Sequence, residues 1–160
     1  MSSILKIKLK QMQKVAKEVC SELKEDHHVK GIVLFGSLVK GDVHPYSDID
    51  IAILWSGILN RPFVRKKLKR KGEEIDIFYI QERSLDKNFM MFVDCLRNSR
   101  VIYDPQGVMD KWREKAEEWR FPKDWIIKKM NDIECYFQIA EHMMEEKDLF
   151  SSVLLIRGDW

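Results

Sequence analysis

Residues 31–54 read GIVLFGSLVKGDVHPYSDIDIAIL, and the rest of the chain is organised around this stretch. Its first part is a short run of apolar, largely β-type residues that closes at Gly36, which predicts a buried strand. A polar segment follows, and then a second strand is expected over residues 48–55. That strand opens with Asp48 and Asp50, so two carboxylates stand on alternate residues of one strand.

Composition limits the class of protein. The chain has 160 residues and is 45% apolar, which is enough for one ordinary domain with a core. With 28 basic and 26 acidic side chains, the overall charge argues neither for nor against a nucleic-acid partner. The three cysteines are far apart and form no CxxC pair, so neither a disulfide framework nor a zinc site is indicated.

The setting is expected to be cytoplasmic, with no membrane association. No apolar run approaches the roughly 20 residues needed to span a bilayer. The N-terminus, MSSILKIKLKQMQK, mixes lysines with its apolar residues and has no small-residue cleavage site. It therefore does not resemble a secretory signal.

Apolar spacing predicts the remaining elements. Helices are expected over residues 3–26, 85–98, 108–119 and 123–147, and strands over 30–35, 48–55, 73–80 and 101–103. The simplest division is an α/β unit over 1–105 and a helical C-terminal extension over 106–160. Because residues 149–160 begin like a core helix and then stop, this extension reads as shortened.

Two segments allow more than one interpretation. Residues 61–71, RPFVRKKLKRK, carry seven basic side chains and no acidic one, which favours a solvated face or a mobile loop. The alternative is that some of these cations approach a polyphosphate or an acidic acceptor. Asp26-His27-His28 suggests metal at first sight, but adjacent residues at a helix end are expected to point apart, which favours a structural role.

The acidic residues carry the chemistry. Side chains alternate along a strand, so Asp48 and Asp50 face the same way. Carboxylates so close repel one another and persist most easily beside a cation, for which Mg²⁺ is the natural choice. Glu74 and Asp76 repeat the spacing, and if their strand lies beside the second strand, Asp76 completes a cluster of three. Three acids at a sheet edge suit a two-metal displacement.

The turn before the acids supplies the other half of a nucleotide site. Gly36 lets the backbone turn sharply and approach a ligand closely. Ser37 is expected to begin a helical turn, where free amides and the hydroxyl can bind phosphate oxygens. Lys40 adds a positive charge there.

Gly36-Ser37, a ten-residue spacer and Asp48-x-Asp50 together closely resemble the fingerprint of the DNA polymerase β-like nucleotidyltransferase superfamily. The resemblance implies a mixed β-sheet flanked by helices. It also implies Mg²⁺-dependent transfer of a nucleoside monophosphate, expected to be AMP, from an NTP such as ATP to a hydroxyl, releasing pyrophosphate. The short chain with its helical tail is similar to the small bacterial and archaeal members, including antibiotic nucleotidyltransferases and minimal ones that pair with a helical toxin.

The resemblance also assigns roles by position. Gly36 and Ser37 would hold the outer phosphates, with Lys40 beside them. Asp48 and Asp50 would hold two magnesium ions. Asp76 would be the third carboxylate, also near the metals, and would help to position or deprotonate the acceptor hydroxyl.

Two other functions compete with this one. One is an antitoxin or regulatory protein that docks a helical toxin. The other is a nucleic-acid-directed enzyme, which is disfavoured because residues 61–71 hold a single aromatic side chain, Phe63, for base stacking. His44, Tyr46 and Tyr79 are candidates for the acceptor pocket by proximity alone.

Overall fold

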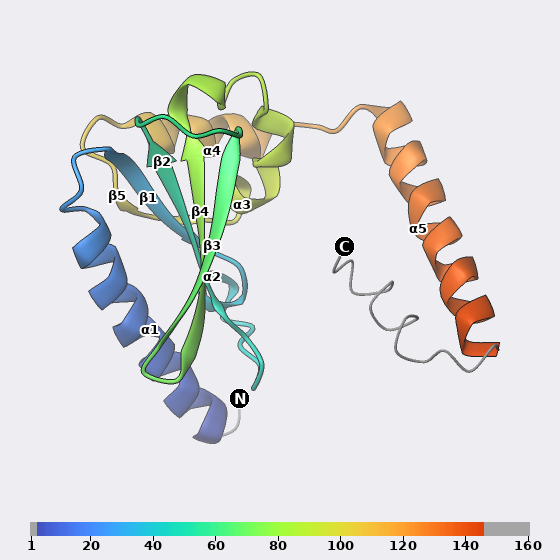
Figure 1. Ribbon diagram of the computed structural model, residues 1–160, viewed down its shortest axis with the longest axis horizontal. Helices are drawn as coiled ribbons and strands as arrows, with labels where there is room; N and C mark the ends of the chain where they lie inside the picture. The colour runs from blue at the N-terminus through green and yellow to red at the C-terminus, as the bar shows by residue number, and fades with distance from the viewer. Residues whose placement is uncertain (1–2, 146–160) are drawn as a thin grey trace. The chain divides into compact units, whose positions relative to one another are not determined.

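The computed structural model describes residues 3–145 (Figure 1). The chain forms two compact units, which meet in sequence between Trp119 and Arg120. The first unit contains the sheet and the acidic residues. The second contains one helix, α5 (Lys123–Glu145), within the described part of the chain.

A five-stranded sheet forms the centre of the first unit, in the order β3-β4-β2-β1-β5 (Figure 1). The strands are β1 (Val29–Phe35), β2 (Ile49–Trp55), β3 (Phe63–Arg70), β4 (Glu73–Gln81) and β5 (Arg100–Tyr103). Strands β2 and β4 are parallel, and every other neighbouring pair is antiparallel. The sheet is therefore mixed, as the resemblance implies.

Helices flank the sheet on both faces. They are α1 (Ser3–Leu23), α2 (Ser37–Lys40), α3 (Val93–Arg97) and α4 (Val108–Glu118), with 3₁₀ turns η1 (Glu82–Ser84) and η2 (Phe89–Met91). The buried residues of α1 recur at steps of three and four, as one apolar face requires; they are Met12, Val15, Ala16, Val19 and Cys20. They form a core with the odd-numbered isoleucines of β2 and β4. On the other face, α4 presses Met109 so close to Gly31 that a Cβ there would lie 2.3 Å from Met109 Cγ.

The basic segment is a strand, so its interpretation as a mobile loop is wrong. Strand β3 pairs antiparallel with β4 along its whole length. Lys71 and Gly72 connect the two strands with φ angles of 51° and 86°. Positive φ at both central residues is what a type I′ hairpin turn requires. The lysines also suit an edge strand, because charge discourages pairing with another chain.

The helix expected over residues 85–98 is much shorter, and only α3 within it is α-helical. The apolar side chains of this segment are buried as expected, but polar side chains donate hydrogen bonds to backbone carbonyls that precede them in sequence. Ser84 Oγ donates to the carbonyl of Gln81 at 2.9 Å, and Asn88 Nδ2 donates to the carbonyl of Ser84 at 2.9 Å. Such local bonds compete with a continuous helix.

The C-terminal extension expected from the sequence begins within the first unit, which contains the sheet. Helix α4 belongs to it, and Arg97 donates to the carbonyls of Ala116 and Trp119 at the end of α4. A division after residue 105 stays a prediction. The stretch over residues 149–160, which begins like a core helix, lies outside the described residues. Among residues 3–145, no helix has both the length and the apolar character to cross a bilayer.

Candidate active site

Strand pairing brings the three aspartates together. Asp50 on β2 and Asp76 on β4 are direct partners in the parallel register, and Asp48 immediately precedes β2. One carboxylate oxygen of each lies within 4.8 Å of the others. The alternation of side chains along β2 and β4 places all three on the sheet face opposite α1. The sequence predicts a cluster of three acids if the two acidic strands are neighbours, and β2 and β4 are neighbours.

Burial and neighbouring negative charges both favour the protonated form of Asp50 in this acidic triad. Burial raises the pKa of Asp50 to about 6, and the charges of Asp48 and Asp76 contribute to the rise, while Arg65 opposes it. Asp76 is only 3% exposed. A buried carboxylate needs a partner, and Arg65 provides one: its Nη2 donates to Asp76 Oδ2. The triad is thus an anionic site that is only partly neutralised by the protein.

Arg65 is the site residue that sequence reasoning did not single out. It lies on β3, with its guanidinium 5.4 Å from the Phe78 ring centroid. The hydrogen bond to Asp76 raises the pKa of Arg65 further above its usual range. The sequence did contain a signal for Arg65. Three cations occupy alternate positions of β3, and each lies opposite an alternate residue of β4 in the hairpin. Their partners are Arg65 with Phe78, Lys67 with Asp76 and Lys69 with Glu74.

Gly36 lies directly against Asp50. A Cβ atom on Gly36 would be 2.1 Å from Asp50 Oδ2, and the residue has φ 73° and ψ −156°. These two facts exclude any side chain at this turn between β1 and α2. Ser37 is the first residue of α2, so its backbone and hydroxyl follow directly on the glycine that contacts the triad.

Two cavities lie at different points along β4, one lined by Asp48 and Asp76 and the other by Gly36, the glycine next to Asp50. The larger, about 340 Å³, is mostly apolar and lies beside the second half of β4; its lining includes Phe35, Gly36, Lys40, Phe63, Phe78 and Phe92. The smaller, about 270 Å³, lies at the start of β4 and is lined by Asp48, Lys67, Lys69, Glu74 and Asp76 among others. Lys40 therefore shares the larger cavity with Gly36, whereas Asp48 and Asp76 line the smaller cavity, which holds both basic and acidic side chains.

The remaining candidates are placed less favourably. Glu74 is exposed and shares the smaller cavity, outside the triad. Tyr46 is 97% exposed in the loop before β2. His44 is exposed in the same loop, with its Nε2 3.3 Å from Asp42 Oδ1. The ring of Tyr79 packs edge-on against that of Trp55, with 5.4 Å between the ring centroids. Tyr79 lies on the face of the sheet that α1 covers, so it does not face the triad.

The family model described as "Nucleotidyltransferase domain" matches residues 12–150. The match covers most of the chain, so the protein belongs to the nucleotidyltransferase domain family. The mixed sheet flanked by helices fits this family, and the acidic triad is its candidate metal site.

A solved structure supports the fold. A nucleotidyltransferase-like protein from Exiguobacterium sibiricum 255-15 superposes with a TM-score of 0.53 at 10% identity; the alignment covers 90% of this chain and 52% of that one. The chain thus spans about half the length of this relative. A structure described as a toxin-antitoxin with AMP-PNP has a TM-score of 0.43 and 16% identity, covering 86% of this chain and 97% of that one. No curated protein matches the chain.

Proposed function

We propose that this protein transfers a nucleoside monophosphate, with AMP the expected group, from an NTP to a hydroxyl of a small molecule or a protein, and releases pyrophosphate. We place this activity in the cytoplasm. The observation that carries the proposal is the convergence of Asp48, Asp50 and Asp76 within 4.8 Å, against a glycine turn with no room for a side chain. A structural role alone does not explain three neighbouring carboxylates with one cationic partner.

The donor set fits Mg²⁺. Carboxylate oxygens are the ligands magnesium prefers, usually together with substrate phosphates. Asp48 and Asp50 would hold the metal, with Asp76 as the third carboxylate. Burial, with a contribution from the charges of Asp48 and Asp76, raises the pKa of Asp50, so a bound cation would favour its charged form. When bound, the metal ions would supply charge neutralisation on the phosphate oxygens and polarise the reacting oxygens.

The chain's own residues would perform the remaining tasks. Gly36 would let the triphosphate approach the backbone, while Ser37 and Lys40 would contact its outer phosphates. In the transfer, the acceptor oxygen forms a bond to the α-phosphorus, and the bond from that phosphorus to the pyrophosphate oxygen breaks with its electrons. The acceptor proton leaves to a base. Asp76 is the candidate: Arg65 occupies Oδ2, which leaves Oδ1 for the acceptor hydroxyl.

The larger cavity offers a place for an apolar or aromatic part of a substrate. Phenylalanines from β1, β3, β4 and the segment before α3 line it, and Phe35 and Phe78 lie 5.6 Å apart between ring centroids. Planar rings stack well on such side chains. Because Gly36 and Lys40 share this cavity, we assign it to the nucleotide, and the smaller cavity beside Asp76 to the acceptor.

The test combines binding with transfer. Thermal unfolding is measured with Mg²⁺ and each of the four NTPs, and transfer is followed with α-labelled ATP. ATP with Mg²⁺ should raise the Tm of the wild type, and Asp48→Asn should lose this shift. Glu74→Gln is the matched control, because Glu74 lies on the same face but outside the triad, and it should keep the shift.

Transfer gives the decisive result for the roles of the acids. Asp50→Asn should abolish release of pyrophosphate and labelling of any acceptor. Full transfer by Asp50→Asn, or a wild type that no NTP stabilises, would contradict the proposal.

A protein partner is the second candidate, as an acceptor or a docked toxin. The observation that favours it is on α5, where Met130, Ile133 and Phe137 are each more than half exposed. Co-purification of a stable complex that survives Asp48→Asn and Asp50→Asn would support docking as the main function. Its absence, together with label transfer to a small molecule, would exclude it.

A further inference from the structure

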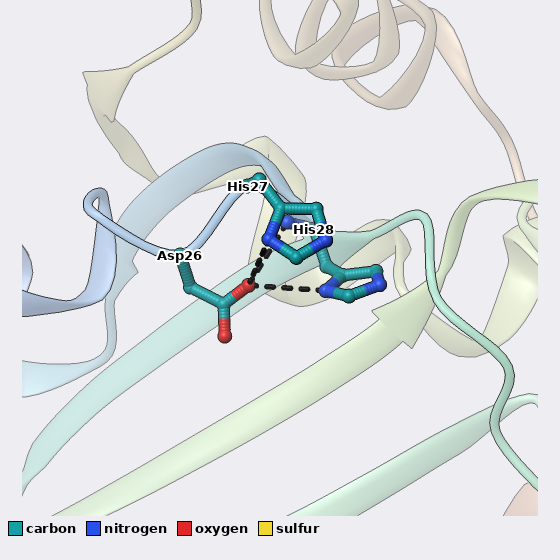
Figure 2. Close-up of side chains that lie close together, drawn as sticks. All are labelled: Asp26, His27 and His28. Atoms are coloured by element: carbon teal, nitrogen blue, oxygen red, sulfur yellow. Dashed lines mark hydrogen bonds and ion pairs between the residues drawn. The ribbon is translucent and has the colours of Figure 1, made fainter.

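The turn between α1 and β1 brings three potential metal ligands together. Asp26, His27 and His28 lie outside the helix, in a turn closed by a bond from the amide of Val29 to the carbonyl of Asp26 at 2.9 Å. The expectation that the histidines point apart is wrong, because it assumed helical geometry for adjacent residues. Their ring centroids are 3.8 Å apart, and both rings lie on the same side as the Asp26 carboxylate (Figure 2).

The distances between ligand atoms are close to those of a coordination sphere. Nδ1 of His28 lies 3.2 Å from Asp26 Oδ1, and Nδ1 of His27 lies 3.9 Å from the same oxygen (Figure 2). The three ligand atoms are all within 4.8 Å of one another. Metal–ligand bonds of about 2.0–2.2 Å in a tetrahedral site separate ligand atoms by roughly 3.3–3.6 Å. Small side-chain rotations would therefore suffice to bind an ion.

Two of the three ligands are already held in place. The ring of His28 stacks on the ring of Trp55, with 4.9 Å between the ring centroids and an interplanar angle of 25°. Its carbonyl accepts hydrogen bonds from the amide of Ser56 at 2.9 Å and from the Ser56 hydroxyl at 3.1 Å. Its amide donates to Asp26 Oδ1 at 2.9 Å, and this bond keeps the pKa of Asp26 below its usual range. His27, whose side chain is 84% exposed, is the ligand that would move.

The donor types select the metal. Two imidazoles and one carboxylate suit Zn²⁺ and the neighbouring divalent transition metals, whereas Mg²⁺ prefers oxygen. Three protein ligands leave at least one position for water, so the site would be open. It is also separate from the triad: Val29 pairs with Trp55 at one end of β1, and Phe35 pairs with Asp50 at the other. At about 3.3 Å per residue, this length of strand separates the two sites by roughly 20 Å.

We propose that Asp26, His27 and His28 form a binding site for one divalent transition-metal ion, with Zn²⁺ as the reference ion. The bound ion would tie the end of α1 to the end of β2 through His28 and its contacts with Trp55 and Ser56. The site does not depend on the nucleotidyl-transfer activity.

Zn²⁺ binding to the full chain tests this, measured by calorimetry in excess Mg²⁺ and in a Cys135→Ser background to remove an exposed thiol. One ion per chain should bind. His27→Gln and Asp26→Asn should each weaken binding about tenfold or more, and His27→Gln with His28→Gln should abolish it. Asp48→Asn should bind normally. Circular dichroism and Tm without metal confirm that the variants fold, and His27→Gln is the safest, because His27 is exposed.

His44→Gln is the matched control. It removes another exposed histidine that lies beside an aspartate, Asp42, but has no second imidazole next to it in sequence. It should leave Zn²⁺ binding unchanged. Co²⁺ in place of Zn²⁺ adds a second readout, since its visible spectrum reports nitrogen ligands and should change in His27→Gln. Absence of stoichiometric binding, or binding that survives the His27→Gln, His28→Gln double variant, would overturn the proposal.

Discussion

The carboxylate of Asp50 occupies the space that a side chain on Gly36 would fill. A Cβ atom there would lie 2.1 Å from Asp50 Oδ2. Gly36 directly follows β1, and Asp50 lies on the neighbouring strand β2, where it pairs with Phe35. The glycine turn and the candidate metal-binding carboxylate therefore form one structural unit, in which the position of each depends on the other.

Replacing this glycine should disturb the site more than replacing a neighbouring one. Gly41 has nearly the same φ, 74° against 73°, but a Cβ atom there would meet nothing within 4 Å. Gly41→Ala should cost only backbone strain, about 1–2 kcal/mol. Gly36→Ala adds a clash with Asp50 and places alanine at φ 73° and ψ −156°, a region that almost only glycine adopts, whereas Gly41 has ψ 14°. It should therefore lose about 1–3 kcal/mol more and nearly all transfer activity. Urea unfolding and label transfer measure both; equal losses in the two variants would contradict the contact.

The raised pKa of Asp50 predicts a pH effect on stability without metal. Its folded-state value of about 6 lies above the unfolded value of about 3.9. Between these values the folded state binds more protons, so the free energy of unfolding should fall as pH rises from about 4 to 6 and stay low above it. After discounting for solvent screening, the loss should be about 1–2 kcal/mol.

Asp50→Asn is the variant that tests this. Without Mg²⁺ it should be about 1–2 kcal/mol more stable than wild type at a pH of about 7.5, although it loses activity, and its stability should change less between about pH 4 and 6. Asp42→Asn, at an exposed position, should keep the wild-type profile. Lower stability of metal-free Asp50→Asn under these conditions would show that burial and the neighbouring charges do not destabilise the Asp50 carboxylate as described.

Arg65 should stabilise the metal-free protein by neutralising Asp76. Asp76 is 3% exposed, so Arg65→Gln leaves a buried carboxylate without its cation, which should cost about 2–3 kcal/mol. Arg70→Gln on the same strand is the control. It breaks an exposed pair with Glu22 and should cost less than about 1 kcal/mol.

Magnesium should separate the two arginine variants further. A cation at the triad takes over the role of Arg65, so Mg²⁺ should raise the Tm of Arg65→Gln more than that of the wild type or of Arg70→Gln. An equal Mg²⁺ response in all three would mean that Arg65 does not act through the triad.

Lys67 and Lys69 should raise the affinity for the anionic substrate. They line the smaller cavity and make no hydrogen bond or ion pair with any residue the structure describes. The smaller cavity is assigned to the acceptor, but both lysines share it with Asp48 and Asp76, beside which the triphosphate would lie. Lys67→Ala with Lys69→Ala should therefore raise the KM for ATP several-fold at low salt, with a smaller difference at high salt because salt screens charge. Lys66→Ala, on the other face of β3, should have little effect. A salt-independent change would indicate a structural cause.

Much of the fold follows from local patterns. Short apolar runs, the periodicity of α1 and the alternation of acids along residues 48–50 and 74–76 depend only on neighbours in sequence, and the expected strands match β1, β2, β4 and β5 within one or two residues. The basic segment is harder to predict because seven cations obscure the alternation that makes β3 a strand. The helix expected over 85–98 is too long because side-chain bonds to the backbone are not visible in apolar spacing.

The amino-acid sequence alone specifies the residues of the candidate active site: a glycine turn, Ser37, and aspartates at positions that one strand face must share. Folding in three dimensions determines which of them meet. The parallel pairing of β2 with β4 places Asp76 beside Asp50, the hairpin brings Arg65 to Asp76, and the turn after α1 directs both imidazoles toward Asp26. The difference is one of range: alternation and apolar spacing act between neighbours, whereas the partner of a buried charge is set by strand register and by chain segments far apart in sequence.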